Sequence, residues 1–244
     1  MIEVNGLKKC FGTVQALKNV TFQAHDNKIT GILGPNGAGK TTTLRIIYGI
    51  IDPNQGSARV DGIDVRHKRI DAQKRLGVLP ESHGLYPRLT ARENIRYYGL
   101  LQRVGRAVLD RKIDALVSML EMEDIIDRPS EGFSNGERSK VAIARALIHD
   151  PKNILLDEPT SGLDVMSTRA MRSFIRRLRD EGKCVLLSSH IMQEVSLLCD
   201  EIVVIAKGEV VAAGSPDSLR ATTGRDNLED AFVAAIGTEE GLER

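Results

Sequence analysis

The sequence has almost no excess of charge of either sign. Its 244 residues include 34 lysines and arginines against 33 aspartates and glutamates, which leaves a net charge of +1. Proteins that bind nucleic acid or an anionic membrane through a broad electrostatic field carry a marked basic excess. The balance argues against both kinds of partner, and we expect no nucleic-acid partner.

Long apolar runs and closely spaced cysteines are also missing. No run approaches the roughly 18 residues that suggest a membrane span, and the first residues lack the basic and apolar regions of a signal peptide. Cys10, Cys184 and Cys199 are odd in number and lack the spacing of a metal site, which suits a reducing cytoplasm. Because 41% of the residues are apolar, the chain can bury a sizeable core. We expect a cytoplasmic globular protein that reaches a membrane only through a partner.

The most informative stretch spans residues 34–42, which read Gly-Pro-Asn-Gly-Ala-Gly-Lys-Thr-Thr. These residues match the phosphate-loop pattern G-x-x-x-x-G-K-[ST]. An ordinary glycine-rich turn between a strand and a helix is the alternative. Residues 28–33 before the loop are typical of a short buried strand, and residues 42–48 after it are typical of a helix that ends at Gly49. This context favours a nucleotide-binding loop.

Each residue type in the loop has a chemical reason. Gly34, Gly37 and Gly39 allow positive φ angles and let backbone N–H groups approach a phosphate. The helix that follows adds free N–H groups and the positive end of its dipole. We expect Lys40 to reach the β- and γ-phosphates and the Thr41 hydroxyl to bind Mg²⁺.

Two further predicted strands end in polar side chains. Residues 152–158 predict a strand buried on both faces, with Asp157 and Glu158 at its carboxyl end, where open α/β sheets bind ligands. In a phosphate-loop protein Asp157 would hold Mg²⁺ through water, and Glu158 would act on the attacking water as a general base. Residues 184–190 predict a second buried strand that brings His190 to the same edge. The alternatives are a solvated acidic turn and a structural histidine.

Two other motifs are weaker when each is considered alone. Ser134 and Glu137 match a capping box, S-x-x-E, and the simpler interpretation is a well-formed helix start. Phe11 lies beside Gly12, where an aromatic ring can stack on a base, although core packing is the commoner role. Neither motif indicates a function by itself.

The order of the predicted elements indicates the fold class. Strands alternate with helices from residue 29 onward, which predicts an α/β fold with a mainly parallel sheet. Residues 2–33, together with an Asp-Gly hairpin at residues 57–65, predict an antiparallel β layer. Residues 89–127 have amphipathic helical spacing and predict a helical insertion. The expected architecture is a phosphate-loop NTPase core with an N-terminal antiparallel β layer and an inserted α-helical subdomain.

Taken in order, these features resemble the ATP-binding subunit of ABC transporters over about residues 2–220. Residues 34–42 resemble the Walker A loop, residues 154–158 the Walker B strand, and residues 134–137 lie at the signature position. The resemblance implies one ATP-binding domain. Its expected bounds are residues 1–220, with a helical subdomain inserted at about 86–148 and a short C-terminal tail at 221–244.

The resemblance also implies ATP and Mg²⁺ as cofactors and a role for each site residue. Glu158 would be the catalytic base, and His190 the switch histidine that contacts the γ-phosphate. The implied metal residues are Thr41, Glu81 and Asp157. The implied nucleotide-contacting residues are Phe11, Gly34, Asn36, Gly37, Gly39, Lys40, Thr41, Thr42, Ser134, Gly136 and Asp164.

The chain departs from the family pattern at a few of these positions. Phe11 stands where tyrosine is more usual, and Glu81 stands where the family usually has a glutamine that senses Mg²⁺ and faces the membrane subunit. Asn135 and Glu137 depart from the common signature Ser-Gly-Gly-Gln. A glutamate at position 81 can still reach the metal, but it adds a negative charge that glutamine lacks.

The family resemblance implies partners. Two cassettes pack head to tail, so that Ser134 of one closes over the ATP held by the other, and we expect a homodimer bound to an integral membrane permease at the inner face of the cell membrane. Residues 84–87 and 228–232 look like those of exporters of the sodium-extruding (NatA) kind. The alternative is a soluble ABC ATPase acting on ribosomes or in DNA repair. Such relatives usually have two cassettes or a long coiled-coil insertion, which this sequence lacks.

Overall fold

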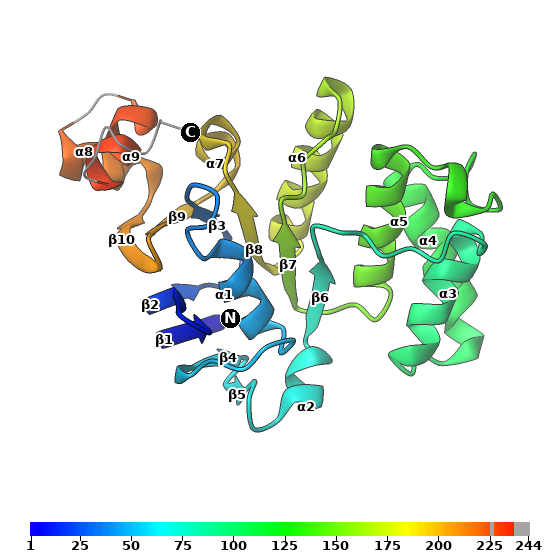
Figure 1. Ribbon diagram of the computed structural model, residues 1–244. Coiled ribbons are helices and arrows are strands. Elements are labelled where there is room, and N and C mark those ends of the chain that lie inside the picture. The colour runs from blue at the N-terminus through cyan, green and yellow to red at the C-terminus, as the bar shows by residue number, and fades with distance from the viewer. Residues whose placement is uncertain (225–226, 237–244) are drawn as a thin grey trace.

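The computed structural model describes residues 1–224 and 227–236, which form one ten-stranded sheet flanked by helices (Figure 1). The predicted tail, residues 221–244, lies partly outside the described residues. The strands are β1 (Ile2–Phe11), β2 (Val14–Ala24), β3 (Ile29–Leu33), β4 (Gln55–Val60), β5 (Ile63–Asp64), β6 (Leu76–Leu79), β7 (Asn153–Asp157), β8 (Cys184–Ser189), β9 (Glu201–Ala206) and β10 (Glu209–Gly214). The helices are α1 (Lys40–Ile47), α2 (Arg69–Gln73), α3 (Ala91–Leu101), α4 (Arg106–Leu120), the 3-10 helix η1 (Ser130–Gly132), α5 (Asn135–Leu147), α6 (Val165–Asp180), α7 (Met192–Leu198), α8 (Pro216–Thr223) and α9 (Leu228–Ile236). None of these helices combines the length and the apolar character of a membrane span.

One half of the sheet is parallel. The strand order is β5-β4-β1-β2-β10-β9-β3-β8-β7-β6, and the strands from β9 to β6 pair in parallel. Every residue of β3, β7 and β8 is buried, which explains why these segments are nearly continuous apolar runs. Because neighbouring parallel strands end at the same edge, the segments that follow β3, β8 and β7 lie side by side.

The other half of the sheet confirms the predicted antiparallel layer. β1 pairs antiparallel with β2 and β4, and β4 pairs antiparallel with β5. The turn between β4 and β5 is made by Asp61 (φ 48°) and Gly62 (φ 77°), the two positive angles that an Asp-Gly hairpin turn requires. β10 joins the halves, since it pairs antiparallel with β9 and parallel with β2.

Helices α3, α4 and α5 pack together beside the β6 edge of the sheet (Figure 1). Ile95, Ile113 and Val141, one from each helix, are fully buried in the core cluster that also contains side chains of β7 and β8. Thr90 and Ser134 begin α3 and α5 with complete capping boxes. The predicted insertion is therefore helical, while its bounds at residues 86–148 stay a prediction.

The helix after the phosphate loop begins earlier than the sequence predicts. α1 starts at Lys40 rather than at residue 42, because Gly39 adopts a left-handed conformation (φ 112°) at its N-cap. Lys40 and Thr41 thus lie in the first turn, beside the free N–H groups of the helix start. This placement brings both side chains to the carboxyl edge of the sheet.

The contact between β6 and α5 leads to a prediction. A Cβ added to Gly77 would lie 2.6 Å from the carbonyl oxygen of Ala146 and 2.7 Å from Pro151 Cγ. Because this backbone oxygen has no room to move, Gly77→Ala is expected to lower the free energy of unfolding by about 2 kcal/mol, measured by chemical denaturation. Gly132→Ala is the control, since nothing lies within 4 Å of an added Cβ there. Equal stability of Gly77→Ala and the wild type would contradict this account of the packing.

Candidate functional site

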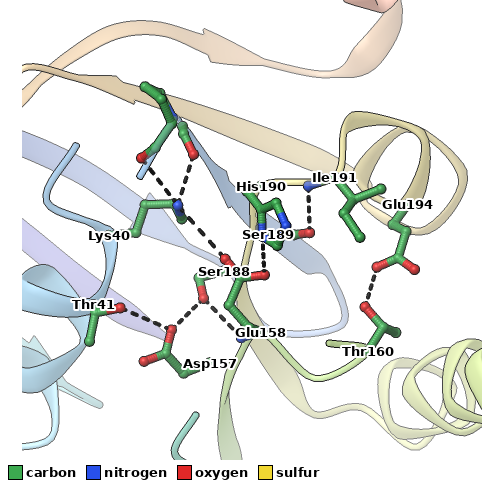
Figure 2. A network of polar contacts seen from close by, with 12 residues as sticks. Lys40, Thr41, Asp157, Glu158, Thr160, Ser188, Ser189, His190, Ile191 and Glu194 are labelled. Atoms are coloured by element: carbon green, nitrogen blue, oxygen red, sulfur yellow. Dashed lines mark hydrogen bonds and ion pairs between the residues drawn. The ribbon is translucent and has the colours of Figure 1, made fainter. Parts of the chain in front are cut away.

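The candidate site lies at the edge where β3, β8 and β7 end (Figure 2). β3 leads into the phosphate loop, which delivers Lys40 and Thr41 at the start of α1. β7 ends at Asp157, followed by Glu158, and His190 directly follows β8. The structure therefore brings together five predicted site residues that are far apart in the sequence.

Glycines shape the phosphate loop. At Gly39 an added Cβ would lie 2.6 Å from Leu17 Cδ2, and at Gly34 it would lie 2.2 Å from the carbonyl oxygen of Ile205. Gly37, in the left-handed region at φ 78°, has open space where a Cβ would be. The loop is thus packed against the sheet at its two ends and open at its centre. An open, glycine-lined loop is what close approach of a phosphate requires.

Lys40 carries a nearly buried positive charge, with 6% of the residue exposed. Its Nζ donates to the carbonyl oxygens of Gly34 (2.8 Å) and Pro35 (3.3 Å) and lies 3.7 Å from Glu158 Oε1. A buried ammonium group is stable only where acceptors or anions surround it. Lys40 is therefore held in place as a cation that fits the anionic phosphates of a nucleotide.

Asp157 is a buried carboxylate whose Oδ1 atom lies beside two hydroxyl groups. Only 3% of the residue is exposed. Ser188 Oγ donates to Asp157 Oδ1 at 2.6 Å, and Thr41 Oγ1 lies 3.4 Å from the same oxygen. Burial raises the pKa of Asp157, the hydrogen bond from Ser188 lowers it, and the negative charges of Glu81 and Glu158 raise it further.

These residues fit a magnesium ion. Thr41 and Asp157 offer the hard oxygen donors that Mg²⁺ prefers, and a divalent cation would offset the negative charge that crowds Asp157. Across residues 1–224 and 227–236, no group of three or more His, Cys, Asp or Glu side chains is arranged to hold a metal by itself. A nucleotide site does not need such a group, because phosphates and waters complete the coordination of Mg²⁺.

Glu158 lies between two nitrogen-bearing side chains. Its Oε2 is 2.9 Å from His190 Nδ1, and its Oε1 is 3.7 Å from Lys40 Nζ. The carboxyl side chain is 11% exposed and the histidine side chain 46% exposed, so the pair opens toward solvent on the histidine side. A carboxylate at this place can accept a proton from a water molecule that His190 helps to orient.

Ser134, Gly136 and Asp164 lie at the starts of α5 and α6. Ser134 caps α5, and Asp164 caps α6 by accepting from the N–H groups of Met166 and Ser167, each at 2.9 Å. Hydrogen bonds from the backbone N–H and from the hydroxyl of Ser167 lower the pKa of Asp164. The two helix starts are neighbours, since a Cβ on Gly136 would lie 3.4 Å from Ser167 Oγ. Within the described residues, no hydrogen bond or ion pair joins them to the phosphate loop.

The remaining predicted residues are Phe11, Asn36, Thr42 and Glu81, and they differ in exposure. Phe11 is 50% exposed, with Lys9 Nζ 5.1 Å from its ring centroid, so it does not pack in the core. Asn36 is exposed in the phosphate loop, and Thr42 is half-buried in α1. Glu81 is exposed and lines a hollow of about 490 Å³ that Glu158 also lines.

Ser188 is a residue of this site that the sequence reasoning missed. Its hydroxyl donates to Asp157 and accepts from the backbone N–H of Glu158 at 3.1 Å. It supports Glu158 at a point where the backbone has a φ of 50°, uncommon for a residue other than glycine. The available signal was a serine in the buried, otherwise apolar strand β8, where a hydroxyl needs a partner.

Three comparisons with known proteins agree on one family. A family model described as "ABC transporter" matches residues 17–161. The chain is 44% identical to the ABC transporter ATP-binding protein NatA of Bacillus subtilis (strain 168), over 91% of each chain. It is similar to the solved structure of an ATP-binding subunit of an ABC transporter, with a TM-score of 0.89 and 28% identity over 96% of this chain and 99% of that chain. A dimeric bacterial ABC transporter cassette matches with a TM-score of 0.81 and 27% identity, over 88% of this chain and 98% of that chain.

The environment of Asp157 predicts that its negative charge lowers the stability of the empty protein and favours the binding of a cation. Because folding raises the pKa of Asp157, its protonated form favours the folded state at acid pH, and that contribution is lost as the pH rises through the raised pKa. Asp157→Asn is therefore expected to raise the melting temperature by a few degrees at neutral pH, and by less at acid pH. The same variant should lose the further stabilisation that Mg²⁺ gives in the presence of ATP.

Thermal melts with and without Mg-ATP measure both effects. Asp110→Asn is the matched control, because Asp110 of α4 is an exposed acid that pairs with Arg96 of α3. Such surface pairs contribute little to stability. A lower melting temperature of Asp157→Asn at neutral pH, or an undiminished response to Mg²⁺, would refute this interpretation of the site.

Proposed function

We propose that this chain, which belongs to the ABC transporter family of ATP-binding proteins, hydrolyses ATP to drive export through a separate membrane subunit. The observation that carries the proposal is the position of Glu158 between Lys40 and His190 at the end of the buried strands. A general base, a phosphate-binding cation and a switch histidine then share one edge of the sheet. That the chain is an ATP-binding subunit of an ABC transporter follows from the family itself.

The proposed division of labour in the site follows from its contacts. Lys40 holds the β- and γ-phosphates in exchange for its present carbonyl acceptors. Thr41 and Asp157 would hold Mg²⁺, and the negative charge of Glu81, which acts on Asp157, would favour the same cation. When bound, the ion supplies charge that offsets the charge developing on the transferred phosphoryl group. Glu158 accepts the proton of the attacking water.

Dimerisation is part of the proposal because one chain carries only half of each site. The start of α5, with Ser134 and Gly136, offers free N–H groups and a helix dipole to an anion. These residues have no bond to the chain's own phosphate loop within the described residues, so their nucleotide would be the one held by a second cassette. Similarity to a solved dimeric cassette supports this arrangement.

The cargo and the location are proposed on the likeness to exporters of the sodium-extruding kind, including 44% identity to NatA. We place the chain on the cytoplasmic face of a membrane, bound to a permease, with sodium as the first cargo to test. No side chain of the candidate site is proposed to bind the cargo, which the membrane subunit selects. A soluble role on ribosomes or in DNA repair remains the competing outcome of the capture experiment below.

The assignment of Glu158 predicts a separation of binding from turnover. Glu158→Gln keeps the size of the side chain but removes its basicity, so kcat is expected to fall by about a hundredfold or more, while ATP still binds. Steady-state phosphate release and fluorescent-nucleotide titration measure the two quantities. Glu181→Gln, which breaks only an exposed ion pair with Arg177, is the matched control. Wild-type turnover in Glu158→Gln would refute the assignment of the base.

The partner is tested by capture. Tagged Glu158→Gln protein, with Mg-ATP present to hold the closed state, is purified from detergent-solubilised membranes and its companions are identified by mass spectrometry. We expect a stoichiometric polytopic membrane protein. Recovery of ribosomal or DNA-bound proteins, with nothing that spans a membrane, would replace the exporter proposal with the soluble alternative.

A further inference from the structure

A buried polar contact lies just beyond the candidate site. The Thr160 hydroxyl donates to Glu194 Oε2, and the two residues are 7% and 8% exposed. Thr160 follows Glu158 by two positions, and Glu194 follows His190 by four. Figure 2 shows both pairs, with the chain running from Glu158 to Thr160 and from His190 to Glu194. Neither residue of this contact belongs to the predicted site.

Glu194 has a second partner that anchors it. Arg172 of α6 lies 3.3 Å from Glu194 Oε1 through its Nη2 atom. A buried carboxylate without a cation or a donor would be strongly destabilising. Glu194 of α7 therefore connects α6 with the loop that precedes α6, and each of its oxygens has its own partner.

The loop between Glu158 and α6 combines turns, apolar packing and the polar contact to α7. Two turns shape it. The N–H of Ser161 donates to the carbonyl oxygen of Glu158 at 3.1 Å, and the N–H of Leu163 donates to the carbonyl oxygen of Thr160 at 3.2 Å. It ends at Asp164, the N-cap of α6. Both turns are internal to the loop. Buried Pro159 and the packing of Leu163 against the core hold the loop to the sheet, and the Thr160 hydroxyl adds the polar contact that joins it to α7.

The segments that leave β7 and β8 are thus joined at two points. The first is the pair of Glu158 and His190, which belongs to the site. The second is the pair of Thr160 and Glu194, which lies farther along the same two segments and is buried. Side-chain contacts at two points restrain the relative orientation of the two segments more strongly than one contact would.

We infer that Glu194 is a positioning residue, which through Thr160 holds the loop ending at Asp164 against the helix that follows His190. The catalytic carboxylate, the switch histidine and the interface loop then move together when a second cassette closes on the site. This inference rests on the proposed function for the roles of Glu158, His190 and Asp164. The contact itself does not.

Thr160→Val tests the inference, because it keeps the shape of the side chain and removes the donor. We expect kcat for ATP hydrolysis by the full chain to fall roughly tenfold through misplacement of the reacting groups, with KM and nucleotide affinity changed by less than about twofold. Thr160→Ser keeps the hydroxyl and should restore kcat. The double variant Thr160→Val with Glu194→Ala should be no slower than the slower single variant, because either change already breaks the contact between Thr160 and Glu194.

Glu181→Gln is the control for a lost carboxylate at the end of the same helix α6, and its kcat should equal that of the wild type. A wild-type kcat in Thr160→Val would overturn the inference. So would a loss that Thr160→Ser does not restore, since that would mark Thr160 as important only for packing.

Amide hydrogen exchange separates this inference from the proposed function. If the wild-type chain hydrolyses no ATP, the proposed function fails, yet the connection can still be measured. Thr160→Val is expected to raise exchange at the loop amides of Ser161 and Leu163 and at the start of α7, and to leave β3 unchanged. Unchanged exchange in both segments would overturn the connection itself.

Discussion

The site depends on the parallel register of three buried strands. Leu33, the last residue of β3, pairs with Ser189 of β8, and Asp157, the last residue of β7, pairs with Ser188. The phosphate loop, the hydroxyl of Ser188 and the acidic pair therefore leave the sheet at one level. A slip of one residue between β7 and β8 would turn Asp157 toward the opposite face of the sheet. Full burial of these strands makes such a slip costly, so the packing of the core fixes the geometry of the site.

Electrostatics within the site favour an occupant over the empty state. Burial and two neighbouring carboxylates raise the pKa of Asp157, which means that its ionised form is disfavoured where it stands. Lys40 is nearly buried and is satisfied by carbonyl oxygens and by Glu158 at the longer distance of 3.7 Å. A cation beside Asp157 would favour its ionised form, and the phosphates of a nucleotide are anions that Lys40 could bind in place of its present acceptors. A buried carboxylate of raised pKa beside a buried lysine is more typical of a binding site than of a structural network.

The sequence predicted those parts of the structure that a local pattern encodes. The phosphate loop, the buried strands and the Asp-Gly hairpin each follow from a run of neighbouring residues with a known conformational demand. The start of α1 was placed too late because the left-handed Gly39 acts as the N-cap, a conformation that the pattern of apolar residues does not reveal. The contacts between Ser188 and Asp157 and between Thr160 and Glu194 join residues that are 31 and 34 positions apart in the sequence. They depend on strand order and register, which no local spacing encodes.

The two acidic departures from the family pattern differ in their physical setting. Glu137 accepts from the backbone N–H of Ser134 at 2.7 Å and pairs with Arg128 at 3.1 Å, and the bond from Ser134 is the first cause of its lowered pKa. A glutamine could make the capping bond but not the ion pair, so the charge of Glu137 is balanced where it stands. Glu81 has no hydrogen bond or ion pair within the described residues, and its charge acts on Asp157 instead. The departure at Glu81 therefore changes the electrostatics around Asp157, whereas the departure at Glu137 preserves the start of α5.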